Sequence, residues 1–164
     1  MSFAALSNAR LLAIMTPVVL LGGAIGSQYL GGLHPCEMCM WQRWPHLVAI
    51  FLALGAIAMR ATPKVSAALT AFAALAIATS GGIGAFHAGV EYGWWQGITA
   101  CSVAAVAGNA QDMLKAIMAA PLVRCDVAPW SLFGVSLAGY NALISLGAAG
   151  VIAALLSRSR RAGA

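Results

Sequence analysis

Long apolar runs, separated by short segments that hold the charged residues, dominate the chain and predict membrane-spanning helices. Apolar runs of about 20 residues are long enough to cross a bilayer as a helix. The run between Arg43 and Arg60 is shorter, and its sixteen residues reach about 24 Å at 1.5 Å per residue. Its flanks must therefore complete the crossing of a hydrocarbon core about 30 Å thick. We expect four spans at about 11–31, 43–60, 65–88 and 131–157, with intervening loops at about 32–42 and 89–130.

Two irregular stretches refine this division. Residues 92–111 lack charge but contain three glycines and several polar side chains, so we predict a loop rather than a fifth span. Residues 103–120 have an apolar face with Asp112 and Lys115 elsewhere, which is typical of a helix lying in the interface plane. Pro121 should end that helix and leave Arg124-Cys125-Asp126 exposed. Pro45 should fall in the first turn of the second spanning helix, where proline is tolerated.

Composition excludes a soluble domain of this size. The chain has 164 residues, of which 62% are hydrophobic and 8% charged, whereas soluble domains carry about 25% charged residues. We therefore predict a single integral membrane domain over residues 1–164. A cleaved signal peptide at residues 1–28 is a less favoured alternative, because the apolar stretch is longer than a typical signal core. The basic residues are few and dispersed, which argues against nucleic acid as a partner.

The distribution of charge predicts the orientation. In a four-span topology, one side holds six basic residues and no acid, and the other holds three basic and four acidic residues. The positive-inside rule then places both termini in the cytoplasm. A fifth crossing would move the basic C-terminal end to the other side and break the rule. All five tryptophans fall beside the outer segments, as expected at a membrane interface. The six basic residues of the cytoplasmic side are Arg10, Arg60, Lys64, Arg158, Arg160 and Arg161.

Small residues spaced by four predict where helices approach closely. Gly22 and Gly26 have this spacing in the first span, and Gly134, Ala138 and Ala142 have it in the last. In lipid, such positions allow close contact between helix backbones. The expected fold is an all-α membrane protein, an antiparallel four-helix bundle with a long outer loop that contains the interfacial helix.

Four cysteines lie on the predicted outer side and suggest redox chemistry. Cys36 and Cys39 form a CxxC pair, which brings two thiols close enough to cycle between dithiol and disulfide. Cys101 and Cys125 lie in the long loop. In a bacterial envelope this side is oxidising, so we favour the pairs Cys36–Cys39 and Cys101–Cys125. A crossed bond such as Cys39–Cys101 would be an intermediate of thiol–disulfide exchange.

Two structural interpretations compete with redox chemistry. A structural disulfide suits Cys101–Cys125, as a staple on a long loop, but suits Cys36–Cys39 poorly, because closing so small a ring stabilises little. A zinc site normally uses two close pairs of ligands, and Cys101 and Cys125 are far apart in sequence. We therefore expect no metal.

The sequence around the cysteines supports a more specific hypothesis. Residues 34–43 read HPCEMCMWQR, a second cysteine pair lies in the long loop, and Pro129-Trp130 precedes the last span. Together these features resemble the disulfide bond formation protein B (DsbB) family, over about residues 10–157. The resemblance implies a quinone-dependent protein-dithiol oxidoreductase of the bacterial inner membrane, part of the system that keeps the periplasm oxidising.

The resemblance also implies a path for electrons. A reduced DsbA-like oxidant of the periplasm would dock on the long loop and attack the Cys101–Cys125 disulfide at Cys101. Electrons would then pass to Cys36–Cys39. Cys39 would engage a quinone, either ubiquinone or menaquinone, from the membrane pool.

Several polar residues are candidates for the quinone site. Arg43 lies one turn after Cys39 on the same helical face and would stabilise the Cys39 thiolate and a quinone oxygen; the alternative is an interfacial arginine that extends outward. By resemblance, His87 would sit near the quinone to donate a hydrogen bond or relay a proton, or else be an ordinary interfacial histidine. Gln42 would support Arg43 or only help the helix enter the membrane. Asn141 should form an interhelical hydrogen bond. His34 and His46 are weaker candidates.

Three rival identities compete with this hypothesis. One is a branch of the same family that serves a dedicated partner instead of a DsbA-like protein, because the loop around Cys101 lacks a distinctive motif. A second is a relative of vitamin K epoxide reductase, in which CxxC is expected late in the bundle rather than after the first span. The third is a non-catalytic structural or assembly subunit whose disulfides are only structural.

Overall fold

The chain folds into long helices, and the prediction of an all-α membrane protein is confirmed. The computed structural model describes residues 3–99, 109, 111, 114, 118 and 123–161. Cys101 and nearly all of the predicted interfacial helix at 103–120 lie outside the described residues, so their arrangement stays a prediction. The described elements are α1 (Phe3–Tyr29), α2 (Glu37–Ala58), α3 (Pro63–Glu91), β1 (Ser131–Leu132), β2 (Val135–Ser136) and α5 (Leu137–Arg161).

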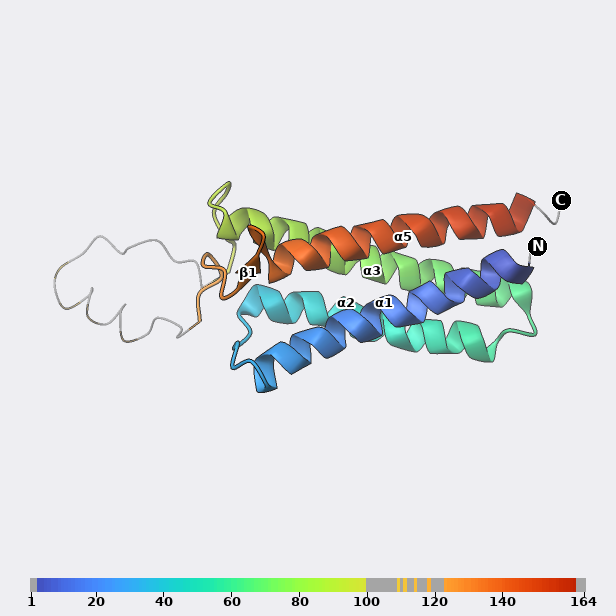
Figure 1. The fold of residues 1–164 in the computed structure, drawn as a ribbon, viewed down its shortest axis with the longest axis horizontal. Coiled ribbons are helices and arrows are strands. Elements are labelled where there is room, and N and C mark those ends of the chain that lie inside the picture. The colour runs from blue at the N-terminus through green and yellow to red at the C-terminus, as the bar shows by residue number, and fades with distance from the viewer. Residues whose placement is uncertain are drawn as a thin grey trace.

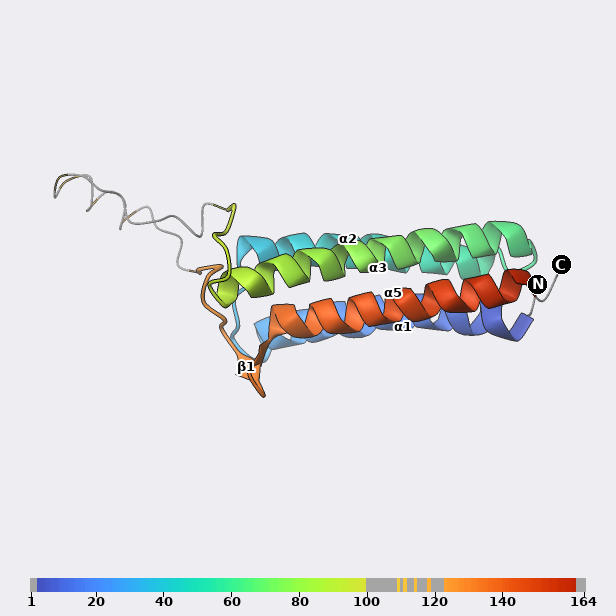
Figure 2. The same ribbon diagram turned by 90° about the horizontal axis from the view of Figure 1, so that it is seen from above.

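The helices lie side by side along one axis, and successive helices run in opposite directions (Figure 1). Both ends of the chain and the turn from α2 to α3 lie at one end of the bundle. The connection from α1 to α2 and the β1–β2 hairpin lie at the other. Figure 2 shows two layers, α2 with α3 and α1 with α5. The bundle therefore brings residues from one end of each of the four helices together.

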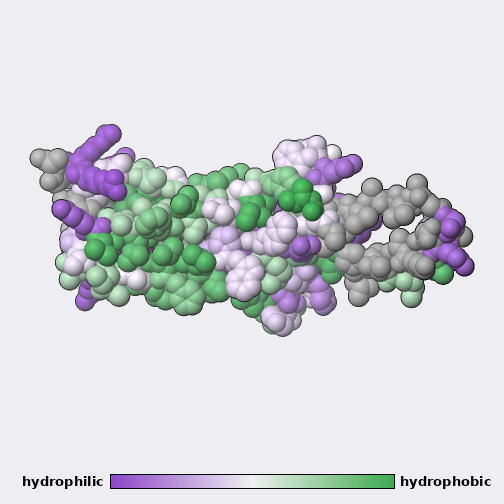
Figure 3. Space-filling model, turned by 180° about the vertical axis from the view of Figure 1, so that it is seen from behind, coloured by the Kyte–Doolittle hydropathy of each residue, from purple (hydrophilic) through white to green (hydrophobic). Residues whose placement is uncertain are grey.

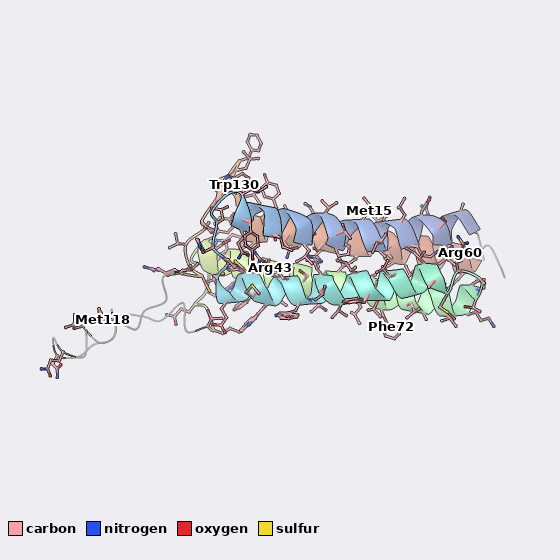
Figure 4. All side chains as sticks on the ribbon, turned by 90° about the horizontal axis from the view of Figure 1, so that it is seen from below. Met15, Arg43, Arg60, Phe72, Met118 and Trp130 are labelled. Atoms are coloured by element: carbon pink, nitrogen blue, oxygen red, sulfur yellow. The ribbon has the colours of Figure 1, made fainter. Side chains whose placement is uncertain are left out.

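Three helices are long and apolar enough to cross a membrane, namely Ala4–Tyr29, Pro63–Glu91 and Leu137–Arg161. Apolar side chains cover the middle of the molecule between more hydrophilic ends (Figure 3). Met15 and Phe72 point outward from the two layers into this belt (Figure 4). The protein is therefore a multi-pass membrane protein.

Helix α2 differs from the other three because its first turns carry polar residues. It begins at Glu37, six residues before the predicted start of the second span, and its 22 residues extend about 33 Å. Pro45 consequently lies inside the helix, so its expected position in the first turn is wrong. Having no N–H, Pro45 leaves the Trp41 carbonyl without its helical donor. The earlier start also places Cys39 in the first turn.

The last helix begins later than predicted. Residues 131–136, expected to open the fourth span, form an antiparallel hairpin in which Ser131 pairs with Ser136 and Leu132 with Val135. Phe133 and Gly134 form its turn, with φ values of 50° and 77°. Two consecutive residues of positive φ are typical of a two-residue hairpin turn and are incompatible with an α-helix. Helix α5 therefore starts at Leu137.

Close helix contact occurs between α3 and α5 rather than on α1. A Cβ added at Gly22 or Gly26 would meet no atom within 4 Å, so the predicted packing role of these two glycines is wrong. In contrast, a Cβ at Gly84 would lie 2.9 Å from the Ala138 carbonyl oxygen. Ala138 and Ala142 are buried as predicted, whereas Gly134 lies in the hairpin turn.

Two apolar clusters divide the interior. The larger one, built mostly from alanines of α1, α2 and α3, fills the half of the bundle that is nearer the termini. A small cluster at the opposite end contains Cys36, Met38, Val90 and Cys125. Two of the cysteines are therefore part of the packed interior, at the end where the predicted site residues gather.

Candidate active site

The Cys36–Cys39 pair caps the N-terminus of α2. Cys36 is the N-cap residue, and its Sγ accepts a hydrogen bond from the Cys39 backbone N–H at 3.2 Å. The two sulfurs are 2.8 Å apart and share a hydrogen bond, whereas a disulfide bond measures about 2.05 Å. One helical turn thus holds the two thiols so close that a small shift of the sulfurs would allow a disulfide bond to form.

The two thiols differ in acidity. The pKa of Cys39 is lowered from its ordinary value of 9.0, mainly because the Cys36 side chain hydrogen-bonds to the Cys39 sulfur; the positive charge of Arg43 acts in the same direction. The pKa of Cys36 is raised, first by this same hydrogen bond and then by burial. Cys39 therefore ionises first and is the more reactive thiolate at neutral pH.

His87 faces Cys36 with a hydrogen-bond donor. The Gln42 side-chain amide donates to the Met38 carbonyl oxygen at 3.2 Å and to His87 Nδ1 at 2.8 Å. Because a backbone carbonyl only accepts, this contact fixes the amide orientation, and Nδ1 must accept. The hydrogen of neutral His87 is then on Nε2, which lies 3.5 Å from Cys36 Sγ.

The same geometry bears on metal binding. Among the described residues, ligand atoms of Cys36, Cys39 and His87 lie within 4.8 Å of one another. With Nδ1 accepting from Gln42, however, His87 Nε2 carries a proton and has no lone pair for a metal. The arrangement therefore suits a hydrogen-bond donor beside two thiols better than a metal ligand.

Glu91 was not identified from the sequence. Its side chain is only 2% exposed, and Oε1 lies 3.7 Å from His87 Nε2. The i,i+4 spacing of the two residues on one helix is the signal that could have found this contact.

Cys125 is buried, contrary to the expectation that residues 124–126 are all exposed. Its side chain is 0% exposed and packs in the cluster that contains Cys36, and Thr99 Oγ1 donates to Cys125 Sγ at 3.4 Å. Its backbone interacts with the ring of His87. Arg124 instead faces solvent and pairs with Asp126, whose pKa it lowers. The chain thus turns one thiol inward between two charged neighbours.

Arg43 joins α2 to α1 across the two layers (Figure 4). Its Nη1 donates to Gln28 Oε1 at 2.6 Å and its Nη2 to the Ala24 carbonyl oxygen at 3.1 Å. The guanidinium is thus held between helices rather than extended outward along a lipid-facing surface. The neighbouring Gln42 amide hydrogen-bonds elsewhere, to Met38, His87 and Asn141.

A cavity of about 250 Å³ opens beside the dithiol. Its walls come from α1, α2, α3 and α5 and are largely apolar, with Val19, Leu20 and Leu137 among the lining residues. The polar lining residues include the predicted candidates Cys39, Gln42, Arg43 and His87, together with His34, His46, Glu91 and Asn141.

A buried hydrogen-bond network continues from the cavity into the bundle. Asn141 Nδ2 donates to Gln42 Oε1 at 2.8 Å and to Ser80 Oγ at 3.1 Å, which confirms the predicted interhelical role of Asn141. His46 Nε2 and Asn141 Oδ1 are 2.9 Å apart. His46 is therefore better placed than the sequence suggested. The sequence spacing could have predicted this position, because Cys39, Gln42, Arg43 and His46 stand at i, i+3, i+4 and i+7 and so lie on one helical face.

The fold and this site define a class: a multi-pass helical membrane protein that carries a dithiol at one end of its bundle. Residues 7–155 match the family described as "Disulfide bond formation protein DsbB". The chain belongs to the DsbB family, which confirms the resemblance stated above and assigns the protein to disulfide bond formation in the membrane.

Other comparisons add little about function. The chain is 25% identical over 140 residues to "Uncharacterized protein RP370" of Rickettsia prowazekii (strain Madrid E), an alignment that covers 84% of this chain and 80% of the relative. No solved structure matches the chain.

Proposed function

We propose that the protein is an inner-membrane oxidase that reoxidises a DsbA-like periplasmic protein and passes the electrons to a membrane quinone. The observation that carries the proposal is the convergence of Cys36, Cys39 and Cys125 at one end of the bundle, beside a cavity onto which Cys39 opens. The net reaction would convert the partner's dithiol to a disulfide. Two electrons and two protons would convert the quinone to a quinol.

The first half of the reaction is disulfide exchange in the long loop. The partner's thiolate attacks Cys101 of the Cys101–Cys125 disulfide, forming a mixed disulfide and releasing Cys125 as a thiolate. The partner's second thiol then breaks the mixed disulfide, so the partner leaves oxidised and Cys101 is released. The loop now holds the two electrons as a dithiol.

The second half moves those electrons to the CxxC pair. Packing of Cys125 against Cys36 supports a crossed Cys36–Cys125 bond, rather than the Cys39–Cys101 bond suggested by the sequence. Cys125 attacks Cys36 and releases Cys39 as a thiolate, and Cys101 then restores the loop disulfide and frees Cys36. His87 Nε2–H, 3.5 Å from Cys36 Sγ, would stabilise the sulfur anion as it departs.

The cavity has the properties expected of a quinone site. Its apolar walls suit a ring with an isoprenoid tail, and its volume of about 250 Å³ is slightly below the range of about 300–1,000 Å³ for small-molecule pockets. His46 Nδ1 is buried there without a hydrogen-bond partner among the described residues. A bound quinone would supply a two-electron, two-proton acceptor. Cys39 would contact its ring, and Arg43 and His87, with Gln42 behind them, would hold its oxygens.

The membrane arrangement is part of the proposal. Helix α2 would also cross the membrane, as the second of four spans, both termini would lie in the cytoplasm, and the cysteines would face the periplasm. Positive charges at the end that carries the termini support this orientation.

Purified protein in detergent, mixed with a reduced DsbA-like substrate, tests the proposal. Ultraviolet absorbance would follow the quinone while free thiols of the substrate are titrated. We expect one quinone to be reduced per substrate disulfide formed, and we expect the reaction to be lost in Cys39→Ser. If the quinone is not consumed and the disulfides resist a mild dithiol, the protein is a structural or assembly subunit instead.

A further inference from the structure

His46 presents one unused nitrogen to the cavity. The residue is 3% exposed, lines the cavity, and lies seven residues after Cys39, about two helical turns deeper in the bundle. Its Nδ1 has no hydrogen-bond partner among the described residues. A buried polar atom left without a partner costs free energy, so this nitrogen is positioned for a ligand.

The hydrogen-bond network fixes which hydrogen-bonding role Nδ1 has. Asn141 Nδ2 lies 3.2 Å from the Ser80 carbonyl oxygen, which only accepts, so the Asn141 amide orientation is set. Its Oδ1 therefore faces His46 Nε2, at 2.9 Å, and must receive a hydrogen from it. Neutral His46 then carries its hydrogen on Nε2 and a bare lone pair on Nδ1.

A bare lone pair discriminates between the two forms of a quinone. A quinone oxygen is only an acceptor, whereas a quinol hydroxyl also donates. The opposite holds at Arg43, where every polar atom of the guanidinium is a donor. The two polar positions on the α2 face thus favour different states of the oxygen they contact.

We propose that His46 is a specificity-determining residue that accepts a hydrogen bond from a quinol hydroxyl and so binds the reduced ligand in preference to the oxidised one. This inference rests on the proposed function. His46 gains and loses no proton in this role, because the protons of the quinol derive from the Cys36 and Cys39 thiols and from solvent. Preferential binding of the reduced form raises the midpoint potential of the bound ligand, and a tenfold preference corresponds to about 30 mV for two electrons.

Equilibrium binding tests the inference without turnover. Cys36→Ser with Cys39→Ser in the full chain removes the reaction between protein and ligand. Calorimetric titration would compare a short-chain ubiquinone with its dithionite-reduced quinol, and a menaquinone analogue in the same two states. We expect His46→Leu in this background to weaken quinol binding about tenfold, the effect of one hydrogen bond, and to change quinone binding less than twofold.

The chain provides a matched control. His34→Leu makes the same chemical change at the outer rim of the cavity, where His34 Nδ1 already lies 3.1 Å from the Gly32 carbonyl oxygen; it should leave the ratio of the two affinities unchanged. His46→Leu should fold, because Asn141 Oδ1 still accepts from Ser145 Oγ at 3.0 Å. Circular dichroism and thermal unfolding verify this.

A second measurement needs no substitution at His46. In ¹⁵N-histidine-labelled protein, the His46 Nδ1 resonance should be that of an unprotonated nitrogen and should shift with the quinol but not with the quinone. Equal shifts, or equal losses of both affinities in His46→Leu, would overturn the inference and leave the quinone-linked function standing. Binding of neither ligand form to the Cys36→Ser/Cys39→Ser protein would overturn both.

Discussion

The main cause of the lowered Cys39 pKa is one neighbour, Cys36. The Cys36 sulfur is the largest cause of the lowered Cys39 pKa, ahead of the Arg43 charge. An anion at Cys39 is therefore stabilised most while Cys36 is reduced, which is when electrons must leave the pair. The redox state of one residue thus controls the reactivity of the other.

The pH dependence of alkylation checks this coupling. In a Cys101→Ser/Cys125→Ser background, Cys36→Ala should raise the Cys39 pKa toward or above 9.0, so alkylation of Cys39 by iodoacetamide slows below that pH. Peptide mass spectrometry of timed samples gives the rate. Cys36→Ser keeps a hydroxyl donor and should recover part of the effect. Superimposable pH profiles for the background protein and its Cys36→Ala variant would contradict the coupling.

Arg43 provides a second test at the residue scale. Arg43→Ala should raise the apparent KM for quinone about ten- to a hundredfold, the effect of losing a charged hydrogen bond. The KM for the dithiol partner should hardly change. Steady-state kinetics with each substrate varied in turn separates the two, and Arg124→Ala serves as the control. An unchanged quinone KM would indicate that Arg43 only joins α2 to α1 through Gln28 and Ala24.

The sequence identified residues that motifs mark, and missed those that only tertiary contacts reveal. The CxxC pair, Arg43 and Gln42 stand in one short run, so their proximity follows from the helix alone. The burial of Cys125 depends on how the loop turns. The charged neighbours Arg124 and Asp126 led to the prediction that Cys125 is exposed. His46 looked isolated because its partner Asn141 is 95 positions away.

At the scale of elements, the contact between α3 and α5 positions the buried hydrogen-bond network around Asn141. Gly81 and Gly84 let α3 approach α5 so closely that Asn141 reaches Gln42 and Ser80. Larger residues would separate these helices. The polar network therefore depends on two positions that have no side chain.

Substitution of these glycines tests the contact. Gly84→Ala should destabilise the protein by about 1–3 kcal/mol, typical of overpacking, because the new Cβ would lie 2.9 Å from the Ala138 carbonyl oxygen. Gly82→Ala is the matched control on the same helix, where a Cβ meets nothing within 4 Å. Thermal unfolding in detergent compares them, and equal stability of both variants would show that the helices separate at no cost.

The sequence predicted where the long helices lie but not all of their ends: α1 begins eight residues before the predicted first span, and α2 begins six residues before the second. Hydropathy located all four long helices because lipid-facing and buried positions are both apolar. It placed the last helix six residues too early, since Ser131–Ser136 is as apolar as a helix but forms a hairpin. Phe133-Gly134 lacks the Asn or Asp that usually marks such a turn.

At the scale of the molecule, Cys36, Cys39 and Cys125 lie at one end of the bundle, and the basic residues near the termini lie at the other (Figure 1). Single cysteines in a cysteine-free background test the membrane sides. Ser131→Cys should react with a membrane-impermeant maleimide in spheroplasts, and Ala61→Cys, in the turn between α2 and α3, should react only after permeabilisation. Mobility shift on a gel gives the result. The reverse labelling pattern would invert the topology.

Cross-linking tests the long-range contact between the α2 cap and the loop. In Cys39→Ser/Cys101→Ser, mild oxidation should form a Cys36–Cys125 bond rapidly, detected by mass spectrometry of unreduced peptides. In Cys36→Ser/Cys101→Ser, the Cys39–Cys125 bond should form more slowly, because Cys36 belongs to the buried cluster with Cys125 while Cys39 lies at its edge. The opposite order of rates would make Cys39 the acceptor of the loop electrons.

Burial of Cys125 and Cys36 also limits which thiols can react with these two cysteines. Small thiols such as glutathione diffuse freely, but Cys125 is 0% exposed and Cys36 only 4% exposed. Under the proposed function, a protein that engages the long loop could reach these sulfurs where a small thiol could not. Under the proposed function, the burial of these two sulfurs would limit the transfer of electrons from unrelated thiols to the quinone pool.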